Sequence, residues 1–143
     1  MMTSPEPDAN PIPEPLRQRL EHVRIGLLRL HKALMEAERI RYERIHGRVP
    51  SPGHLLQLVM NDPWFAWLHP FSRMIVRIDE LLEDQPEATA ADAEGLLGST
   101  RALIRPSESG EGFERTYFEA LQDTPEVAIA HAHVKLLLVS VSA

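Results

Sequence analysis

The chain has 143 residues, a net charge of −6 and no cysteine. A chain of this length usually forms one domain, and the missing cysteines exclude disulfides, thiolate zinc sites and a cysteine nucleophile. The acidic balance argues against nucleic acid as a partner, because nucleic acid binding needs a basic surface. We find no secretory signal and no apolar run long enough for a membrane span, so we expect a cytoplasmic protein.

Proline is frequent at the start of the chain, where it occupies five of the positions from 5 to 15. Proline removes a backbone donor and disfavours helix in the residue before it. We therefore predict that residues 1–14 form a disordered arm. Residues 15–143 are expected to form a single helical-bundle domain.

A long helix is predicted from Glu14 to His46, because apolar residues recur there in alternating steps of four and three. Its seam consists of Leu16, Leu20, Val23, Leu27, Leu30, Leu34 and Ala37. This is the a/d spacing of a coiled coil, sustained over about three heptads. A helix with such a seam packs inside a bundle or against a second subunit, so Leu27, Leu30 and Leu34 are candidate interface residues.

Residues 51–84 hold half of the aromatic residues of the chain, namely Trp64, Phe65, Trp67 and Phe71. The pairs Ser51-Pro52 and Asp62-Pro63 each place a capping side chain before a proline, which predicts two helix starts. Pro70 cannot donate a hydrogen bond inside a helix, so we expect a single turn over 63–68 followed by a helix over 70–84. The aromatic block forms either the bundle core or a ligand pocket lined by the two tryptophans.

The second half of the chain predicts further helices. Residues 88–105 form a weaker helix that contains Gly95 and Gly98, which indicate either a soft helix or a close neighbour. A loop follows over 106–112, then a helix over 113–122 and another after Thr124-Pro125. No strand or repeat is evident. We predict an all-α antiparallel helical bundle of about four main helices with a short extra one.

Seven histidines are the most notable candidates for chemistry. His131 and His133 point to opposite sides of a helix and cannot chelate one ion together. His31 borders the seam of the first helix and His131 continues an apolar face, so both can be buried. They could instead face each other and hold a haem or a transition metal, with His69 as a further ligand and Trp64 and Trp67 as walls.

Three segments carry a resemblance: LRLHKAL with the following ER..YER.HG, the turn SPG.LLQLV, and the element DPWFAWL. Over residues 28–83 the chain resembles a group of short bacterial all-helical proteins whose function is uncharacterised. The resemblance implies a bacterial source and a helical fold. It implies no activity and no catalytic residue.

Motifs for nucleotide binding or hydrolytic catalysis are missing from the sequence, so we assign no catalytic residue. We predict a non-enzymatic helical-bundle interaction protein, a homodimer or larger, that self-associates through the first helix or the aromatic block. The candidate interface residues are Leu27, Leu30, Leu34, Trp64, Phe65, Trp67 and Phe71. The alternative is a cofactor- or metal-binding bundle, with a haem-like ligand bound between helices by His31 and His131.

Overall fold

The computed structural model describes residues 11–83, 85–110 and 112–139. These residues form six α-helices and a 3-10 helix, and they contain no strand, so the all-α prediction is confirmed. The elements are α1 (Glu14–His46), α2 (Pro52–Asn61), η1 (Pro63–Leu68), α3 (His69–Glu83), α4 (Ala90–Leu103), α5 (Phe113–Asp123) and α6 (Pro125–Val139).

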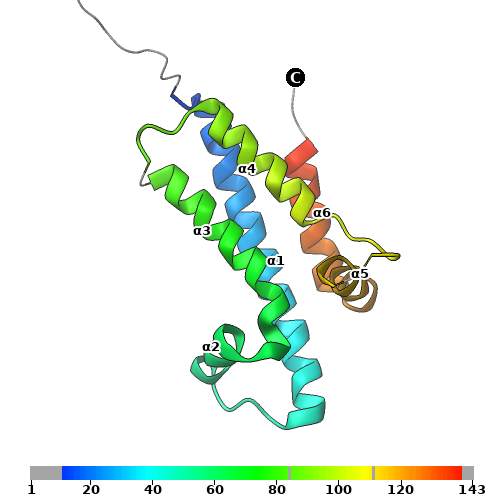
Figure 1. Ribbon diagram of the computed structural model, residues 1–143. Helices are drawn as coiled ribbons and strands as arrows, with labels where there is room; N and C mark the ends of the chain where they lie inside the picture. Colours follow the sequence, from blue (N-terminus) through cyan, green and yellow to red (C-terminus); the bar gives the residue numbers. More distant parts are fainter. Residues whose placement is uncertain (1–10, 84, 111, 140–143) are drawn as a thin grey trace, which may run out of the picture.

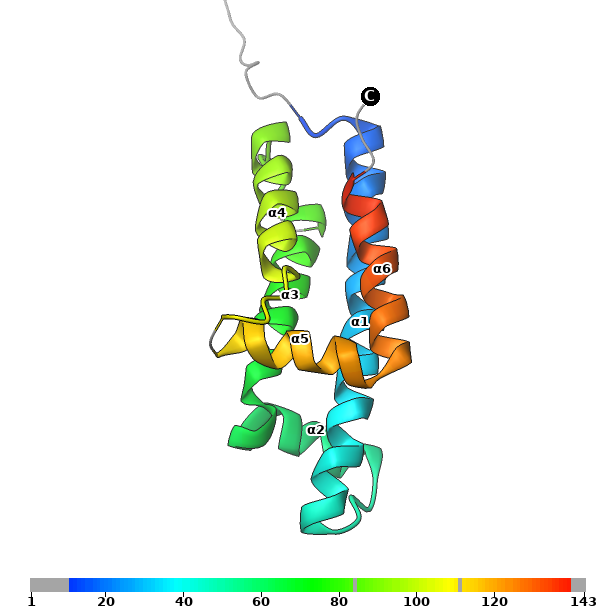
Figure 2. The same cartoon turned by 90° about the vertical axis from the view of Figure 1, so that its right-hand side faces the viewer.

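Four helices run along the length of the molecule. In Figure 2, α1 and α4 run downward, whereas α3 and α6 run upward. The long α1 packs against α6, α3 and α4, and α4 also packs against α3 and α6. The lower end of α1 extends past α6 and lies beside α2 and η1 (Figure 1). Both α2 and α5 are short, so the described residues contain two short helices where the sequence predicted one.

Local capping explains where the helices begin. Ser51 accepts a hydrogen bond from a backbone amide three residues on at 3.1 Å, and Asp62 accepts one two residues on at 2.8 Å. Thr89 and Asp92 form a reciprocal capping box at the start of α4. Each such cap contributes about 1 kcal/mol. The helix starts predicted at Ser51 and Asp62 are confirmed.

The predicted break near Pro70 is also confirmed. The six residues before His69 form the 3-10 helix η1, and α3 begins at His69. Pro70 therefore lies in the first turn of α3, where its missing N–H costs nothing. The break changes the direction of the chain, so η1 packs against α2 while α3 packs against α4.

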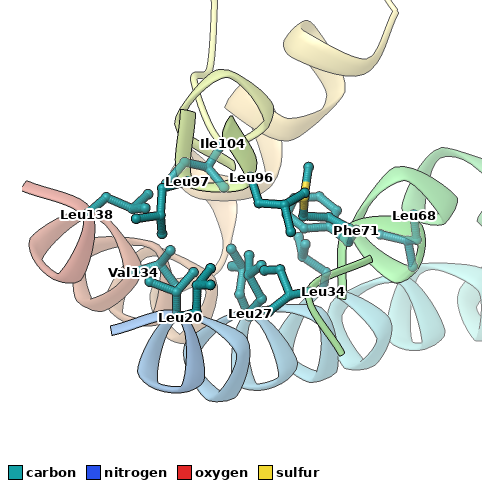
Figure 3. Close-up of a cluster of buried hydrophobic side chains, with 14 of the residues drawn as sticks. Leu20, Leu27, Leu34, Leu68, Phe71, Leu96, Leu97, Ile104, Val134 and Leu138 are labelled. Carbon is teal, nitrogen blue, oxygen red and sulfur yellow. The ribbon is translucent and has the colours of Figure 1, made fainter. Parts of the chain in front are cut away.

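Apolar side chains from all six α-helices and from η1 form one core, part of which is shown in Figure 3. The seam predicted along α1 lies at its centre, and Leu20, Leu27 and Leu34 are all fully buried. The labelled members of the core are Leu20, Leu27, Leu34, Leu68, Phe71, Leu96, Leu97, Ile104, Val134 and Leu138. The seam of α1 is therefore covered by helices of its own chain.

The described chain makes contacts before α1 begins. Pro11 pairs with Thr89 in an isolated bridge, and Ile12 packs on the core. The predicted boundary after residue 14 is therefore too late, because residues 11–13 already belong to the folded unit. The disordered arm predicted for residues 1–10 lies outside the described residues.

Gly26 marks a close approach between α1 and α6. A Cβ atom at this position would lie 3.1 Å from Val134 Cγ2 and 3.4 Å from Leu137 Cδ1. A Cβ atom at Gly95 or Gly98 in α4 would meet nothing within 4 Å. The close-neighbour explanation for these two glycines is therefore not supported, and the soft-helix explanation remains.

Substitutions at these glycines are predicted to change the free energy of unfolding in opposite directions. Gly95→Ala and Gly98→Ala are each expected to stabilise the protein by about 0.5–1 kcal/mol, because alanine loses less backbone entropy in a helix. Gly26→Leu is expected to destabilise it by about 1–3 kcal/mol, because the new side chain overpacks the contact with α6. Urea unfolding of the three variants checks both signs. A fully stable Gly26→Leu protein would contradict the close packing of α1 and α6.

Candidate functional site

The helix α6 is apolar on all sides. Val127, Val134 and Leu138 are buried against the core. On the opposite side, Ile129 is 70% exposed and Leu136 is 71% exposed. A helix that is apolar all round is normally covered all round. The outward side of α6 therefore presents an apolar surface that the described chain does not cover.

This surface is a continuous stripe along α6. Ala132 and His133 are exposed and lie between Ile129 and Leu136 in helical spacing. We call these four residues, Ile129, Ala132, His133 and Leu136, the outer stripe. The stripe contains no lysine, arginine or carboxylate side chain.

The two ends of α6 carry opposite charge. Asp123 and Glu126 are exposed at its N-terminal end. At the other end, the guanidinium groups of Arg19 and Arg101 each donate to the carbonyl oxygen of Leu138 at 3.0 Å. The N-terminal end of α6 is therefore acidic and its C-terminal end is basic.

The seam residues of α1 are not available as an interface. Leu27, Leu30 and Leu34 are fully buried in the core of one chain. A side chain without exposed surface cannot contact a second subunit unless the helices separate. In the described chain these three residues pack the core, so their predicted role in a subunit interface has no support from the structure.

The aromatic block also belongs mainly to the core. Phe65 and Phe71 are fully buried, so their predicted role in an interface likewise has no support from the structure. Trp64 and Trp67 are partly buried and lie in separate contacts. The Trp64 ring meets the edge of Tyr42 with centroids 5.7 Å apart, whereas Trp67 packs against a phenylalanine of α5. The two tryptophans therefore do not pack as the paired walls of one pocket.

His31 connects α1 to α3. Its Nε2 atom lies 3.1 Å from the Ser72 hydroxyl oxygen. Burial and, to a smaller extent, the nearby His69 lower the pKa of His31 below its ordinary value. His69 itself lies 2.9 Å, through Nε2, from the carbonyl oxygen of Val59, so that ring nitrogen donates. Both histidines thus have hydrogen-bond partners within the fold.

His131 connects α6 to α5. Its Nδ1 atom lies 2.6 Å from the hydroxyl oxygen of Tyr117, which is fully buried. Burial raises the pKa of Tyr117 above its usual range. Burial, followed by the charge of Lys135, lowers the pKa of His131. At neutral pH the Tyr117 phenol therefore keeps its proton, and its O–H donates a hydrogen bond to Nδ1 of the neutral His131 imidazole.

The three histidines predicted as metal ligands do not form a site. Within the described residues, no group of three His, Asp or Glu side chains could hold a metal ion. His31 bonds to α3 and His131 bonds to α5, so the two rings do not face each other across a shared ligand. The prediction of a metal site at His31, His69 and His131 is wrong, and the haem arrangement has no support from these contacts.

The lowered histidine pKa values predict a pH-dependent stability. As the pH falls below the ordinary histidine value of 6.5, the unfolded chain takes up protons that folded His31 and His131 resist. The free energy of unfolding should therefore fall between about pH 7 and about pH 5. The lowered pKa values of Glu36 and Glu43 affect stability only below about pH 5.5, where unfolded carboxyl groups begin to take up protons. The range from about pH 7 to about pH 5.5 therefore reports on the histidines.

Urea unfolding at several pH values tests this dependence. The double variant His31→Gln/His131→Gln should show a clearly flatter pH dependence above about pH 5.5 than the parent protein. His54→Gln, which changes an exposed histidine of α2, is the matched control and should keep the parent dependence. An unchanged slope in the double variant would contradict the assignment.

Comparison with protein-family models, with curated proteins and with solved structures gives no match for this chain. Among the helices of the described ranges, none combines the length and the apolar character needed to cross a membrane. The functional argument therefore rests on the side chains themselves.

The outer stripe is the feature that the sequence analysis missed. The sequence pattern did not show that Ile129 is exposed. The signal was present in the run from Val127 to Val139, where apolar residues occupy every side of the helix. A helix that is apolar on opposite sides needs an apolar surface against each of them. The core of the same chain covers one side of α6, so the other side is left for a partner.

Proposed function

We propose that this protein is a non-enzymatic interaction protein, an antiparallel helical bundle that works as a homodimer joined through the outer stripe of α6. The observation that carries the proposal is the exposure of Ile129 and Leu136 on a helix whose opposite side is buried. Burial of a large aliphatic side chain contributes about 1.5–3 kcal/mol. If two copies of the outer stripe pack together, Ile129 and Leu136 become buried on both subunits.

A two-fold axis suits the order of residues in the stripe. In an antiparallel pair of α6 helices, Ile129 lies against the partner's Leu136, and Leu136 lies against the partner's Ile129. Ala132 and His133 are then nearest to the axis. The small side chain of Ala132 permits the two helices to approach closely at that point.

The charges at the ends of α6 favour the same orientation. An antiparallel pair brings the acidic end, with Asp123 and Glu126, toward the partner's basic end. The basic end contains Arg19 and Arg101, which are held at Leu138. A parallel pair would place like charges together. Because a contact centred on one short helix is small, we expect the dimer to dissociate on dilution.

The absence of cysteine permits a direct test of the axis. Ala132→Cys introduces the only thiol of the chain close to the proposed axis, so mild oxidation should give a disulfide-linked dimer. Ala91→Cys, at an exposed alanine of α4, is the matched control and should stay monomeric under denaturing conditions. Equal cross-linking of both variants, or none of Ala132→Cys, would contradict the proposed contact.

A further inference from the structure

A cavity of about 360 Å³ lies between α6 and the C-terminal end of α4. Figure 2 shows both helices above α5, and the two are in contact. Pockets for small organic ligands start at roughly 300 Å³, so this cavity suits a small molecule. It lies on the side of α6 that faces α4, and is therefore distinct from the outer stripe.

The lining of the cavity is basic. Arg101 and Arg105 contribute from the end of α4, Lys135 and His131 contribute from α6, and no carboxylate takes part. This local excess contrasts with the chain as a whole, whose net charge is −6. The C-terminal ends of α4 and α6 both lie at the cavity and each contribute only about half a negative charge, which three full cations outweigh. The cavity therefore attracts an anion.

Two of the three cations of the cavity, Arg105 and Lys135, are available to bind such an anion. The Arg101 guanidinium is fixed by its hydrogen bond to the carbonyl oxygen of Leu138 at 3.0 Å. Across the described residues, no carboxylate pairs with Arg105 or with Lys135. Lys135 lies close enough to His131 to act on its titration. The cavity thus holds two cationic side chains without an acidic partner.

The remaining surface of the cavity is apolar. Val139, which is 62% exposed, and Pro106, which is partly exposed, offer apolar surface to the cavity. The other two apolar lining residues, Ile104 and Leu138, are buried in the core and are labelled in Figure 3. An inorganic anion would leave this apolar surface unused. A molecule with an apolar body and one acidic group would bury the body on Val139 and Pro106, while the acid meets the cations.

We propose that this cavity binds a small organic carboxylate with an apolar body. Arg105 and Lys135 contact the carboxylate, Arg101 holds the wall between the two helices, and Val139 with Pro106 contact the apolar part. Guanidinium and ammonium groups form charge-assisted hydrogen bonds with a carboxylate, and these are stronger than neutral ones. Binding at this place would connect α4 to α6, two helices that are far apart in the sequence.

Isothermal titration calorimetry with three probes tests the site on the full chain. Octanoate is expected to bind, 1-octanol is expected to bind at least roughly tenfold more weakly, and inorganic phosphate is expected to bind more weakly than octanoate. Equal affinity for octanoate and 1-octanol would overturn the role of the cations. Tighter binding of phosphate than of octanoate would overturn the role of the apolar surface, and no binding of octanoate would overturn the proposal.

Variants locate the binding. Arg105→Gln and Lys135→Gln should each weaken octanoate binding by roughly tenfold, because each removes one charge-assisted contact. Arg44→Gln removes an exposed cation at the far end of α1 and should leave the affinity unchanged. Since the changed residues are exposed, the variants should fold, which circular dichroism checks. Unchanged octanoate affinity in both cavity variants would overturn the assignment.

Discussion

Phe71→Ala is expected to lower the free energy of unfolding by about 3–5 kcal/mol, the range for removing a fully buried phenylalanine. Phe71 is fully buried, and its ring centroid lies 5.4 Å from those of both Phe113 and Tyr117. It therefore joins α3 to α5. The cavity left by the substitution should weaken the docking of α5 as well as the core.

Urea unfolding followed by circular dichroism measures this loss. Val76→Ala is the matched control, because Val76 lies on the same helix and is exposed, and its change should stay within about 0.5 kcal/mol. Near-ultraviolet signals should change in Phe71→Ala, because Tyr117 loses its aromatic neighbour. A loss below about 1 kcal/mol for Phe71→Ala would show that the α3–α5 contact is not part of the core.

The double variant Ile129→Glu/Leu136→Glu is expected to weaken the proposed dimer at least 1,000-fold, by roughly 4 kcal/mol or more. Each large side chain contributes about 2 kcal/mol when buried, and glutamate adds a cost for burying charge. Two-fold symmetry places both changes on both subunits. The folded monomer should be unaffected, because both positions are about 70% exposed.

Sedimentation velocity over a range of concentrations measures this effect. The control is Ile45→Glu/Val76→Glu, which adds the same two charges at exposed apolar positions outside α6. This control should sediment like the parent protein. If both double variants dissociate alike, added charge rather than the loss of the outer stripe would explain the result.

Helix boundaries could be predicted because their signals are local. Ser51 and Asp62 cap the helices that follow them, and Gly47 ends α1 with a positive φ of 90°. Each signal acts within a few residues, so the sequence alone reveals it. The break near Pro70 has the same local origin.

The partners of the helices could not be predicted in the same way. Heptad spacing showed that Leu27, Leu30 and Leu34 need an apolar neighbour, but spacing does not distinguish a helix of the same chain from one of another. In the structure, the neighbours are helices of the same chain. The exposed side of α6 was missed because a run with apolar residues on opposite sides does not show which side stays uncovered.

The histidines show a further limit of sequence reasoning. Their hydrogen-bond partners, Ser72 for His31 and Tyr117 for His131, lie 41 and 14 residues away in the chain. A histidine on an apolar helix face has the same sequence signature whether it binds a metal or a hydroxyl group. Only the folded arrangement shows that hydroxyl groups take these positions.

The molar mass of the parent protein in solution tests the proposed function most directly. Sedimentation equilibrium at several concentrations should give a mass that rises from the 16.2 kDa of one chain toward twice that value. Ile129→Glu/Leu136→Glu should remain at the mass of one chain. A parent protein that stays at 16.2 kDa up to millimolar concentration would contradict the proposed homodimer.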